Sequence, residues 1–212
     1  MQQNPVIILG AKGLGKVALE IFKSNNMDVY CFLDDDAKLH NTEIGEISVL
    51  GSTDDDGFLK YIGKKCDAFV ATDDNKLRES IVSTIIDKRK VMPVNAVHNR
   101  AYVSPDAEIG YGNFINAGAI VNVGAKISNN CIVNAGVIIE QDVVLHDMVQ
   151  VGAGSVISTG VVVEQLAFIG SGVTIVSGVT IGKKARIGAG SVVVADVKNG
   201  ETVFGNPAKV VS

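Results

Sequence analysis

The sequence contains no tryptophan, and aromatic residues of all kinds make up only 5% of its 212 residues. Surfaces that bind nucleic acids stack bases on aromatic side chains and pair phosphates with a basic face. This chain has little of either, because its net charge is −4 and its pI is near 5.4. We therefore expect no nucleic-acid partner.

Long apolar runs, a signal sequence and clustered cysteines are also missing. No run of eighteen apolar residues occurs, so we expect no membrane span, although the mean hydropathy is +0.29. Met1–Asn4 has neither the basic start nor the apolar core of a signal peptide, which predicts a cytoplasmic protein. Cys31, Cys66 and Cys131 are odd in number and far apart, so we expect buried free thiols and no metal site.

An aliphatic residue recurs at every sixth position through the second half of the sequence. An α-helix cannot use this period, because successive members would rotate off its apolar face. A strand that turns a corner every six residues can use it, and such short repeats are typical of a parallel β-helix. The key positions are Val103, Ile109, Ile115, Val121, Ile127, Val133, Ile139, Leu145, Val151, Ile157, Val163, Ile169, Ile175, Ile181, Ile187 and Val193.

Three hexads predict one coil of a three-sided prism, so that residues eighteen apart stack. One inward column is then Ile109, Ile127, Leu145, Val163 and Ile181. The residue after each key position is often Gly, Asn or Ser, which we attribute to tight corners, some of them with positive φ. A β-sandwich is the alternative fold, but it has no reason to keep a strict register of six.

The first hundred residues predict a different domain. Strands are expected at Val6–Leu9, Met27–Leu33, Asp67–Ala71 and Val91–Val94, and helices at Lys16–Phe22 and Lys76–Lys88. Alternating strands and helices indicate a small parallel sheet of Rossmann-like type. We place the domains at 1–97 and 98–212, because the six-residue period begins near the boundary.

A glycine-rich loop follows the first predicted strand and precedes the first helix. Backbone N–H groups in such a loop can bind phosphate, with Gly10, Lys12, Gly13, Leu14 and Gly15 as candidates. The order G-x-x-G-x-G differs from the dinucleotide motif G-x-G-x-x-G, which disfavours NAD. Asp34 or Asp35, at the end of the next strand, has the position to accept a ribose hydroxyl. The alternatives are a plain strand-to-helix turn and a solvated acidic loop.

The order of these motifs resembles the family of sugar O- and N-acyltransferases with a hexapeptide-repeat left-handed β-helix. The resemblance rests on the glycine loop, Phe32–Asp36, Thr72–Arg78, Val97–His98, Ile187–Ser191 and Gly205–Lys209, and it covers nearly the whole chain. It implies an α/β Rossmann-like domain followed by an all-β left-handed parallel β-helix. It also implies a homotrimer, with acetyl-CoA between adjacent prisms and a nucleotide sugar held by the N-terminal domain.

The same resemblance points to the catalytic position and to a departure from the family pattern. The family has Glu, His and an acidic residue where this chain has Glu140, Gln141 and Asp142, and a second family histidine corresponds to Gln150. Glutamine can hydrogen-bond but cannot accept a proton near neutral pH, whereas histidine can. His146 is the alternative base, on the next face of the prism.

The resemblance assigns further residues to the substrates and leaves three functions open. Asp73 is assigned to the sugar nucleotide, and the residues assigned to acetyl-CoA are Gln150, Gly152, Ser158, Thr159, Gly170, Gly188, Ala189 and Lys209. The leading function is acetyl transfer to an amino group or hydroxyl of a nucleotide-linked or free sugar. The alternatives are a weakly active or inactive relative that binds these ligands, and a purely structural trimer.

Overall fold

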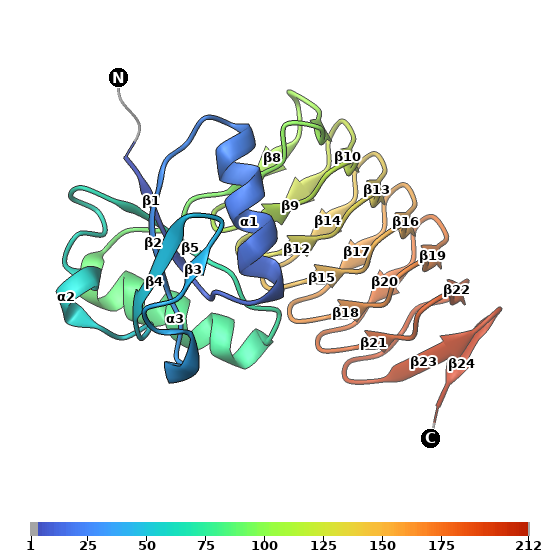
Figure 1. Ribbon diagram of the computed structural model, residues 1–212. Coiled ribbons are helices and arrows are strands. Elements are labelled where there is room, and N and C mark those ends of the chain that lie inside the picture. Colours follow the sequence, from blue (N-terminus) through green and yellow to red (C-terminus); the bar gives the residue numbers. More distant parts are fainter. Residues whose placement is uncertain (1–3, 212) are drawn as a thin grey trace. The chain divides into compact units, whose positions relative to one another are not determined.

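A computed structural model describes residues 4–211 of the chain (Figure 1). The chain divides into two compact units, residues 1–98 and 99–212. We call them the N-terminal domain and the prism, and each is described by itself.

The N-terminal domain is built on a five-stranded sheet in the order β3-β4-β2-β1-β5. Strands β1 (Val6–Leu9), β2 (Val29–Leu33), β4 (Ile47–Gly51) and β5 (Asp67–Val70) are parallel, and β3 (Glu43–Ile44) forms an antiparallel hairpin with β4. The other elements are α1 (Gly13–Ser24), the 3₁₀ helix η1 (Ala37–Leu39), α2 (Asp56–Leu59), α3 (Asn75–Arg89) and β6 (Ala96–Val97). Every residue of β1 is fully buried, which explains its continuous apolar sequence.

Most of the expected elements of this domain are confirmed, with one error. The first three predicted strands correspond to β1, β2 and β5, and the predicted helices lie within α1 and α3. The strand expected at Val91–Val94 is wrong, because this segment has no ladder and makes a single backbone hydrogen bond, from Val94 to Ala68 O. The hairpin β3–β4 and helix α2 were not expected; β3 and α2 have only two and four residues.

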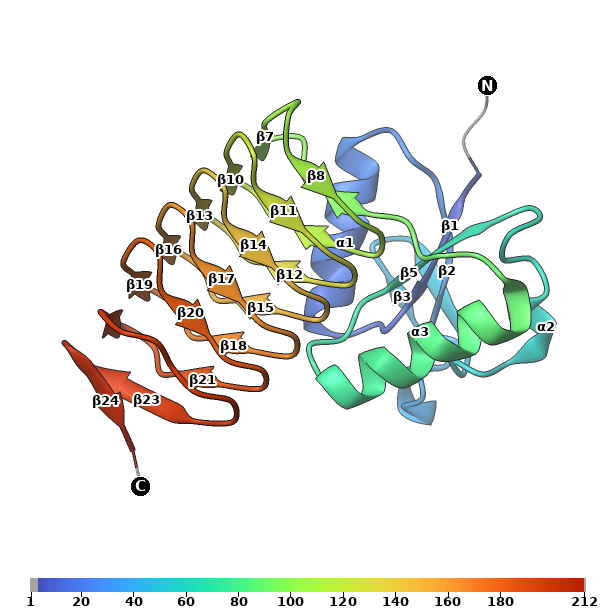
Figure 2. The same cartoon turned by 180° about the vertical axis from the view of Figure 1, so that it is seen from behind.

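The second unit is a left-handed parallel β-helix whose two-residue strands form three faces (Figures 1 and 2). The first face contains β7 (Tyr102–Val103), β10 (Ile120–Val121), β13 (Ile138–Ile139), β16 (Val156–Ile157), β19 (Thr174–Ile175) and β22 (Val192–Val193). The second contains β8 (Glu108–Ile109), β11 (Lys126–Ile127), β14 (Val144–Leu145), β17 (Val162–Val163) and β20 (Thr180–Ile181). The third contains β9 (Phe114–Ile115), β12 (Ile132–Val133), β15 (Gln150–Val151), β18 (Phe168–Ile169), β21 (Arg186–Ile187) and β23 (Thr202–Gly205), and antiparallel β24 (Ala208–Val210) follows β23.

The expected interior of the prism is confirmed. Ile109, Ile127, Leu145, Val163 and Ile181 pair in consecutive ladder positions, eighteen residues apart. Of the sixteen key residues, all are buried except Val103 and Ile109, which lie in the first coil and are half-buried. The second residue of each strand therefore points inward and the first points outward, as strand geometry requires.

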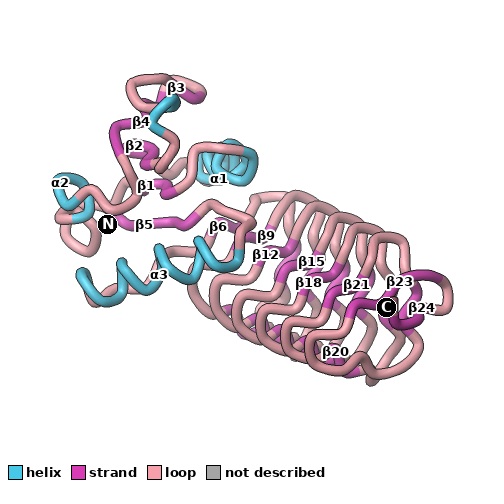
Figure 3. The backbone as a smooth tube through the Cα atoms, turned by 90° about the horizontal axis from the view of Figure 1, so that it is seen from below, coloured by secondary structure: helices cyan, strands magenta, loops and turns pink. Residues whose placement is uncertain are grey.

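Three corners join the faces, and Figure 3 shows the coils that they form. Corner 1 follows the first face and includes residues 140–142 and 158–160. Corner 2 follows the second face and includes residues 146–148 and 164–166. Corner 3 follows the third face and includes residues 152–154, 170–172 and 188–190.

Glycines occur at the corners for two reasons, positive φ and close approach of the next coil, and each reason applies to a different position. Positive φ occurs three residues after the key position, not one residue after it as expected; Gly154 has a φ of 68° there, and Leu166 has 64°. The residue after the key position is small for a different reason. A β-carbon added at Gly170 would lie 2.6 Å from the Ala189 nitrogen in the next coil.

Candidate functional site

A cavity of about 370 Å³ opens at the carboxyl ends of β1, β2 and β5 in the N-terminal domain. The chain leaves β1 for β2 on one side and returns to β5 on the other, so the cavity lies where the strand order reverses. Ligands of open parallel sheets bind at this point. Its lining is Gly10, Lys12, Gly13, Leu14, Asp34, Asp35, Asp36, Thr53, Ala71, Thr72, Asp73, Leu77 and Ile81.

The glycine loop forms one wall of this cavity, and two of its glycines have no room for a side chain. Gly10 has a φ of 115°, and an added β-carbon would collide with the Ala71 carbonyl. A β-carbon at Gly15 would collide with the Gly10 carbonyl, where the first turn of α1 passes over the loop. Gly15 is buried and does not line the cavity, so its part is packing and not ligand contact.

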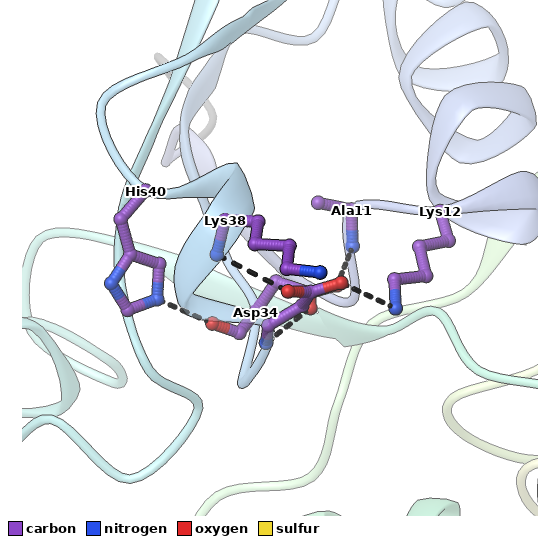
Figure 4. A network of polar contacts seen from close by, with 6 residues as sticks. Ala11, Lys12, Asp34, Lys38 and His40 are labelled. Carbon is purple, nitrogen blue, oxygen red and sulfur yellow. Dashed lines mark hydrogen bonds and ion pairs between the residues drawn. The ribbon is translucent and has the colours of Figure 1, made fainter.

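The Asp34 carboxylate stabilises the glycine loop, and both of its oxygens accept backbone hydrogen bonds (Figure 4). Its Oδ2 accepts a hydrogen bond from the Ala11 N–H at 2.7 Å, and its Oδ1 accepts one from the Asp36 N–H at 2.9 Å. The His40 ring nitrogen Nε2 lies 2.7 Å from the Asp34 carbonyl oxygen.

Asp35 is the aspartate that retains a free carboxylate oxygen. Its Oδ1 accepts hydrogen bonds from the N–H and the hydroxyl of Thr53, both at 2.8 Å. No residue between 4 and 211 bonds to its Oδ2. Of the two aspartates predicted for a ribose hydroxyl, the geometry therefore favours Asp35.

Lys12 and Asp36 face each other at the mouth of the cavity, with Nζ 3.0 Å from Oδ2. The hydrogen bond with Asp36 raises the pKa of Lys12, and the same bond lowers the pKa of Asp36. Lys12 is also the residue before α1, and its side chain does not cap the helix. The positive end of the helix dipole and one lysine thus favour an anion here.

The opposite wall comes from the loop between β5 and α3. Asp74 caps α3, since its carboxylate accepts hydrogen bonds from the N–H groups of Lys76 and Leu77. Arg78 is fully buried beneath this loop; its Nη1 donates to the Thr72 carbonyl at 2.8 Å, and its other nitrogen bonds to the Asn75 side chain. These contacts fix the backbone that carries Asp73 on the cavity wall.

In the prism, Glu140, Gln141 and Thr159 form a polar network at corner 1. Glu140 Oε2 accepts hydrogen bonds from the Thr159 N–H at 3.0 Å and from its hydroxyl at 3.1 Å. The Thr159 hydroxyl also lies 2.9 Å from Gln141 Oε1, so its single proton is shared between Glu140 and Gln141. The Gln141 amide nitrogen has no partner within residues 4–211, so it is the donor that the exposed side chain presents outward.

The neighbouring candidates lie at other positions of a single prism. Asp142 follows Gln141 with a φ of 57°, and Ser158 lies in the same corner. His146 is at corner 2, where its Nε2 lies 3.9 Å from Glu164 Oε2. Gln150 is buried on the outer side of β15 in the third face. One chain therefore does not bring Gln141, His146 and Gln150 together.

The remaining predicted residues lie along corner 3 and at the end of the third face. Gly152, Gly170 and Gly188 repeat every eighteen residues, and a β-carbon at each would collide with the segment stacked on it. Their residue type is thus explained by coil packing alone. Ala189 is exposed in this corner, and Lys209 is exposed on β24.

Several other groups carry no chemistry of their own. Burial raises the pKa of the Cys31 thiol to about 12 and also raises the pKa of the Cys66 thiol, so both stay protonated. All three cysteines are buried and free.

Within residues 4–211 no three His, Cys, Asp or Glu side chains are grouped to hold a metal ion. None of the helices in this range has the length and apolar character that crossing a bilayer requires.

The sequence missed several lining residues for an identifiable reason. Thr53 and Ile81 reach the cavity from segments outside every motif found in the sequence, and Thr72 and Leu77 lie in the Thr72–Arg78 segment without having been given a role. Leu77 and Ile81 lie in the helix expected at Lys76–Lys88, where apolar side chains are ordinarily explained by core packing. Only the packing of α3 beside β5 makes that side a cavity wall.

Comparisons with known proteins agree with both domains. Residues 5–85 match the PglD N-terminal domain, and residues 163–195 match the hexapeptide repeat of succinyl-transferase. A search of curated proteins finds no significant match.

Solved structures match over the whole chain. Perosamine N-acetyltransferase from Caulobacter crescentus, a variant with one histidine replaced by asparagine in complex with CoA and GDP-perosamine, is 31% identical. The match covers 98% of this chain and 97% of that one, with a TM-score of 0.90. The acetyltransferase domain of PglB from Neisseria gonorrhoeae FA1090, in complex with acetyl coenzyme A, is 29% identical. That match covers 99% of this chain and 100% of that one, also with a TM-score of 0.90.

WeeI from Acinetobacter baumannii AYE is 25% identical over 98% of this chain and 99% of that one, with a TM-score of 0.86. Each of these matches covers at least 98% of this chain and therefore includes both domains. The chain belongs to the family of sugar acyltransferases with a Rossmann-like N-terminal domain and a hexapeptide-repeat left-handed β-helix.

Proposed function

We propose that this protein transfers the acetyl group of acetyl-CoA to an amino group of a nucleotide-linked sugar. The observation that carries the proposal is the similarity, over both domains, to an N-acetyltransferase crystallised with CoA and GDP-perosamine. The cavity beside the glycine loop supports it, because that loop is suited to a nucleotide's phosphates.

The N-terminal domain holds the nucleotide sugar in this proposal. Lys12 and the first turn of α1 bind the diphosphate. To do so, Lys12 leaves its ion pair with Asp36 and pairs with the phosphate instead. The free oxygen of Asp35 accepts a hydrogen bond from a nucleoside hydroxyl. Asp34 acts mainly on the structure of the loop, because each of its two oxygens already accepts a backbone hydrogen bond there.

Gln141 acts as a hydrogen-bond donor and not as a base. Its Oε1 is engaged by Thr159, and an amide does not take up a proton near neutral pH. Its amide nitrogen instead donates to an oxygen of the bound sugar or of the thioester. The Glu140 carboxylate keeps Thr159, and through it Gln141, in place.

An amine nucleophile fits a site without a histidine base. The unprotonated amine nitrogen attacks the thioester carbon, the new N–C bond forms, and the C–S bond breaks to release the CoA thiolate. The proton lost by the nitrogen passes through water to the thiolate. A hydroxyl nucleophile depends more strongly on a general base, so the geometry favours N-acetylation over O-acetylation.

We also propose a homotrimer, which the distribution of candidates over the prism supports. Corners 1 and 3 carry Gln141 and the Gly152 column and lie at opposite edges of the first face. The outward residues of that face are largely apolar: Tyr102, Ile120, Ile138, Val156, Thr174 and Val192. Packing of this face against neighbouring copies brings corner 1 of one copy to corner 3 of the next.

The test is thiol release from acetyl-CoA in the presence of UDP-, GDP- or dTDP-linked amino sugars. We expect slow turnover by the wild type and a rate about 10² to 10⁴ higher for Gln141→His, since a positioned base contributes that much. His146→Ala is the control variant, because His146 lies at another corner, and its rate should equal that of the wild type. Sedimentation velocity tests the trimer.

The occupied Oε1 of Gln141 also favours a second candidate function, a protein that binds both ligands without turnover. In that case the wild type binds acetyl-CoA and a nucleotide sugar by calorimetry but releases no thiol. Absence of binding by any acyl-CoA would exclude both functions.

A further inference from the structure

The third position of corner 1 bears a side chain at Asp142, where the neighbouring coils have glycine. Positive φ occurs at this position in four consecutive coils, at Gly124, Asp142, Gly160 and Gly178. Asp142 has a φ of 57°, a conformation that costs energy in a residue with a β-carbon. Residues held in such conformations cluster at functional sites, so we looked for a ligand of this carboxylate.

The Asp142 carboxylate is directed away from the polar network of its neighbour Gln141. Gln141 Oε1 lies 2.9 Å from the Thr159 hydroxyl in the following coil. Asp142 instead lies against the preceding coil, where a β-carbon added at Gly124 would collide with its Oδ1. The two adjacent residues therefore present an amide donor and a carboxylate on the same exposed corner.

No group of the protein neutralises this carboxylate. Within residues 4–211, the Asp142 side chain makes no hydrogen bond and no ion pair. The segments stacked on it, 122–124 and 158–160, contain no titratable side chain. Lys126, which begins β11 after this corner, is already paired with Glu108 at 2.8 Å.

Corner 1 as a whole is acidic. The six segments that follow the strands of the first face contain no lysine, arginine or histidine. They contain four acids: Asp106, Glu140, Asp142 and Asp196. Like charges along one edge create a negative potential that attracts a cation. Glu140 is engaged by Thr159, so Asp142 is the free acid that adjoins Gln141.

We propose that Asp142 recognises the amino group of the sugar substrate and pairs with it as an ammonium ion. A hydrogen bond between two charged groups is about twice as strong as a neutral one. The acetamide of the product is neutral, so the carboxylate favours substrate over product. This inference rests on the proposed function, because it names the group that selects the nucleophile. The resemblance gave Asp142 only a place beside a histidine, which this chain lacks.

The ion pair also sets the protonation state in which the amine binds. The ammonium nitrogen has no lone pair, so it loses one proton to solvent before it attacks the thioester carbon, and Asp142 stays ionised. The neutral amine still donates one N–H to the carboxylate, which leaves its lone pair free for attack. A preference of about 10-fold for the ammonium form raises the pKa of the bound amine by about one unit.

The experiment measures binding of UDP-, GDP- and dTDP-linked amino sugars and of their N-acetylated products by calorimetry at pH 7. The wild type should bind the amino sugar about 10-fold more tightly than its product. Asp142→Asn should bind the two equally, since asparagine keeps the size of the side chain and removes its charge. The parent nucleoside diphosphate should bind both proteins alike, because it lacks the amine.

The pH profile of turnover is a readout that a purely structural role of Asp142 would not move. The wild-type kcat should rise with pH as the bound ammonium loses its proton, and Asp142→Asn should move this rise about one unit lower. The profile of kcat/KM reports the free amine and should keep its pKa.

Two further variants separate recognition from folding. Asp106→Asn removes an exposed acid of the same corner, two coils away, and should keep the wild-type preference. Asp142→Gly suits the positive φ, so it should resist denaturant at least as well as the wild type and still lose the preference. A preference that survives in Asp142→Asn, or that the wild type lacks, would overturn the inference and leave the proposed function intact. If the wild type binds none of the nucleotide-linked amino sugars, the proposed function fails as well.

Discussion

The two domains bring functional residues together in opposite ways. In the N-terminal domain, the site joins residues that have no fixed spacing, such as Ala11 with Asp34 and Asp35 with Thr53. In the prism, ladder partners from β7 to β22 are eighteen residues apart, and Gln141 and Thr159 have the same separation. In a repeat, the sequence therefore predicts which residues contact each other. In a Rossmann-like sheet, it predicts only that residues after the strands lie at the carboxyl edge of the sheet.

The domains also differ in how a local defect should spread. The glycine loop depends on a few close contacts, and the loss of one displaces several cavity residues together. The prism repeats its contacts in each coil, so that a change at one corner is shared mainly with the coils beside it.

The strongest test of this difference is Gly15→Ala. The added methyl group meets the Gly10 carbonyl, so we expect the free energy of unfolding to fall by about 2 to 3 kcal/mol, as for overpacked cores. Gly13→Ala is the control in the same loop, since nothing lies within 4 Å of its added carbon. Hydrogen exchange should accelerate in residues 6–33 and stay unchanged in the prism; faster exchange in the prism would contradict the separation of the two domains.

A smaller effect of opposite sign is expected in the prism. Lys184 is exposed at corner 2 with a φ of 59°, a conformation that costs a side-chain-bearing residue energy and that glycine tolerates. Lys184→Gly should raise the free energy of unfolding by about 0.5 to 1 kcal/mol. The neighbouring Lys183→Gly, at an ordinary φ, should lower it, and denaturant unfolding of both variants measures the difference. Equal effects of the two would show that corner strain is not the cause.

The smallest expected effect concerns the exposed pair at the cavity mouth. The hydrogen bond from Lys12 lowers the pKa of Asp36 below its ordinary value of 3.8, so the pair stabilises the fold above that pH. This contribution is lost as the pH falls through the lowered pKa of the folded state. Lys12→Met should return the pKa of Asp36 toward 3.8, which NMR titration of the carboxyl carbon measures. An unchanged titration would mean that the ion pair does not form in solution.

The sequence predicted the prism more completely than the N-terminal domain. Its period fixed the inward column from Ile109 to Ile181, because ladder partners in a coil of fixed length follow from counting. The purpose of the corner glycines was only half predicted, since the close approach at Gly170 depends on the path of the next coil.

The N-terminal site shows where sequence reasoning ends. The glycine loop and both aspartates were found, because each follows a buried strand. The different roles of the two aspartates were not predicted. The Asp34 carboxylate accepts a hydrogen bond from Ala11, whereas Thr53 uses only one oxygen of Asp35 and leaves the other free. The motif order and the six-residue period by themselves established the two folds and the family.

Only the tertiary structure decided which oxygen or amide is available to a ligand. The physical reason is that hydrogen-bond donors and acceptors are used up by partners distant in the chain. The free amide nitrogen of Gln141 and the free carboxylate of Asp142 are properties of that packing and not of the residues themselves.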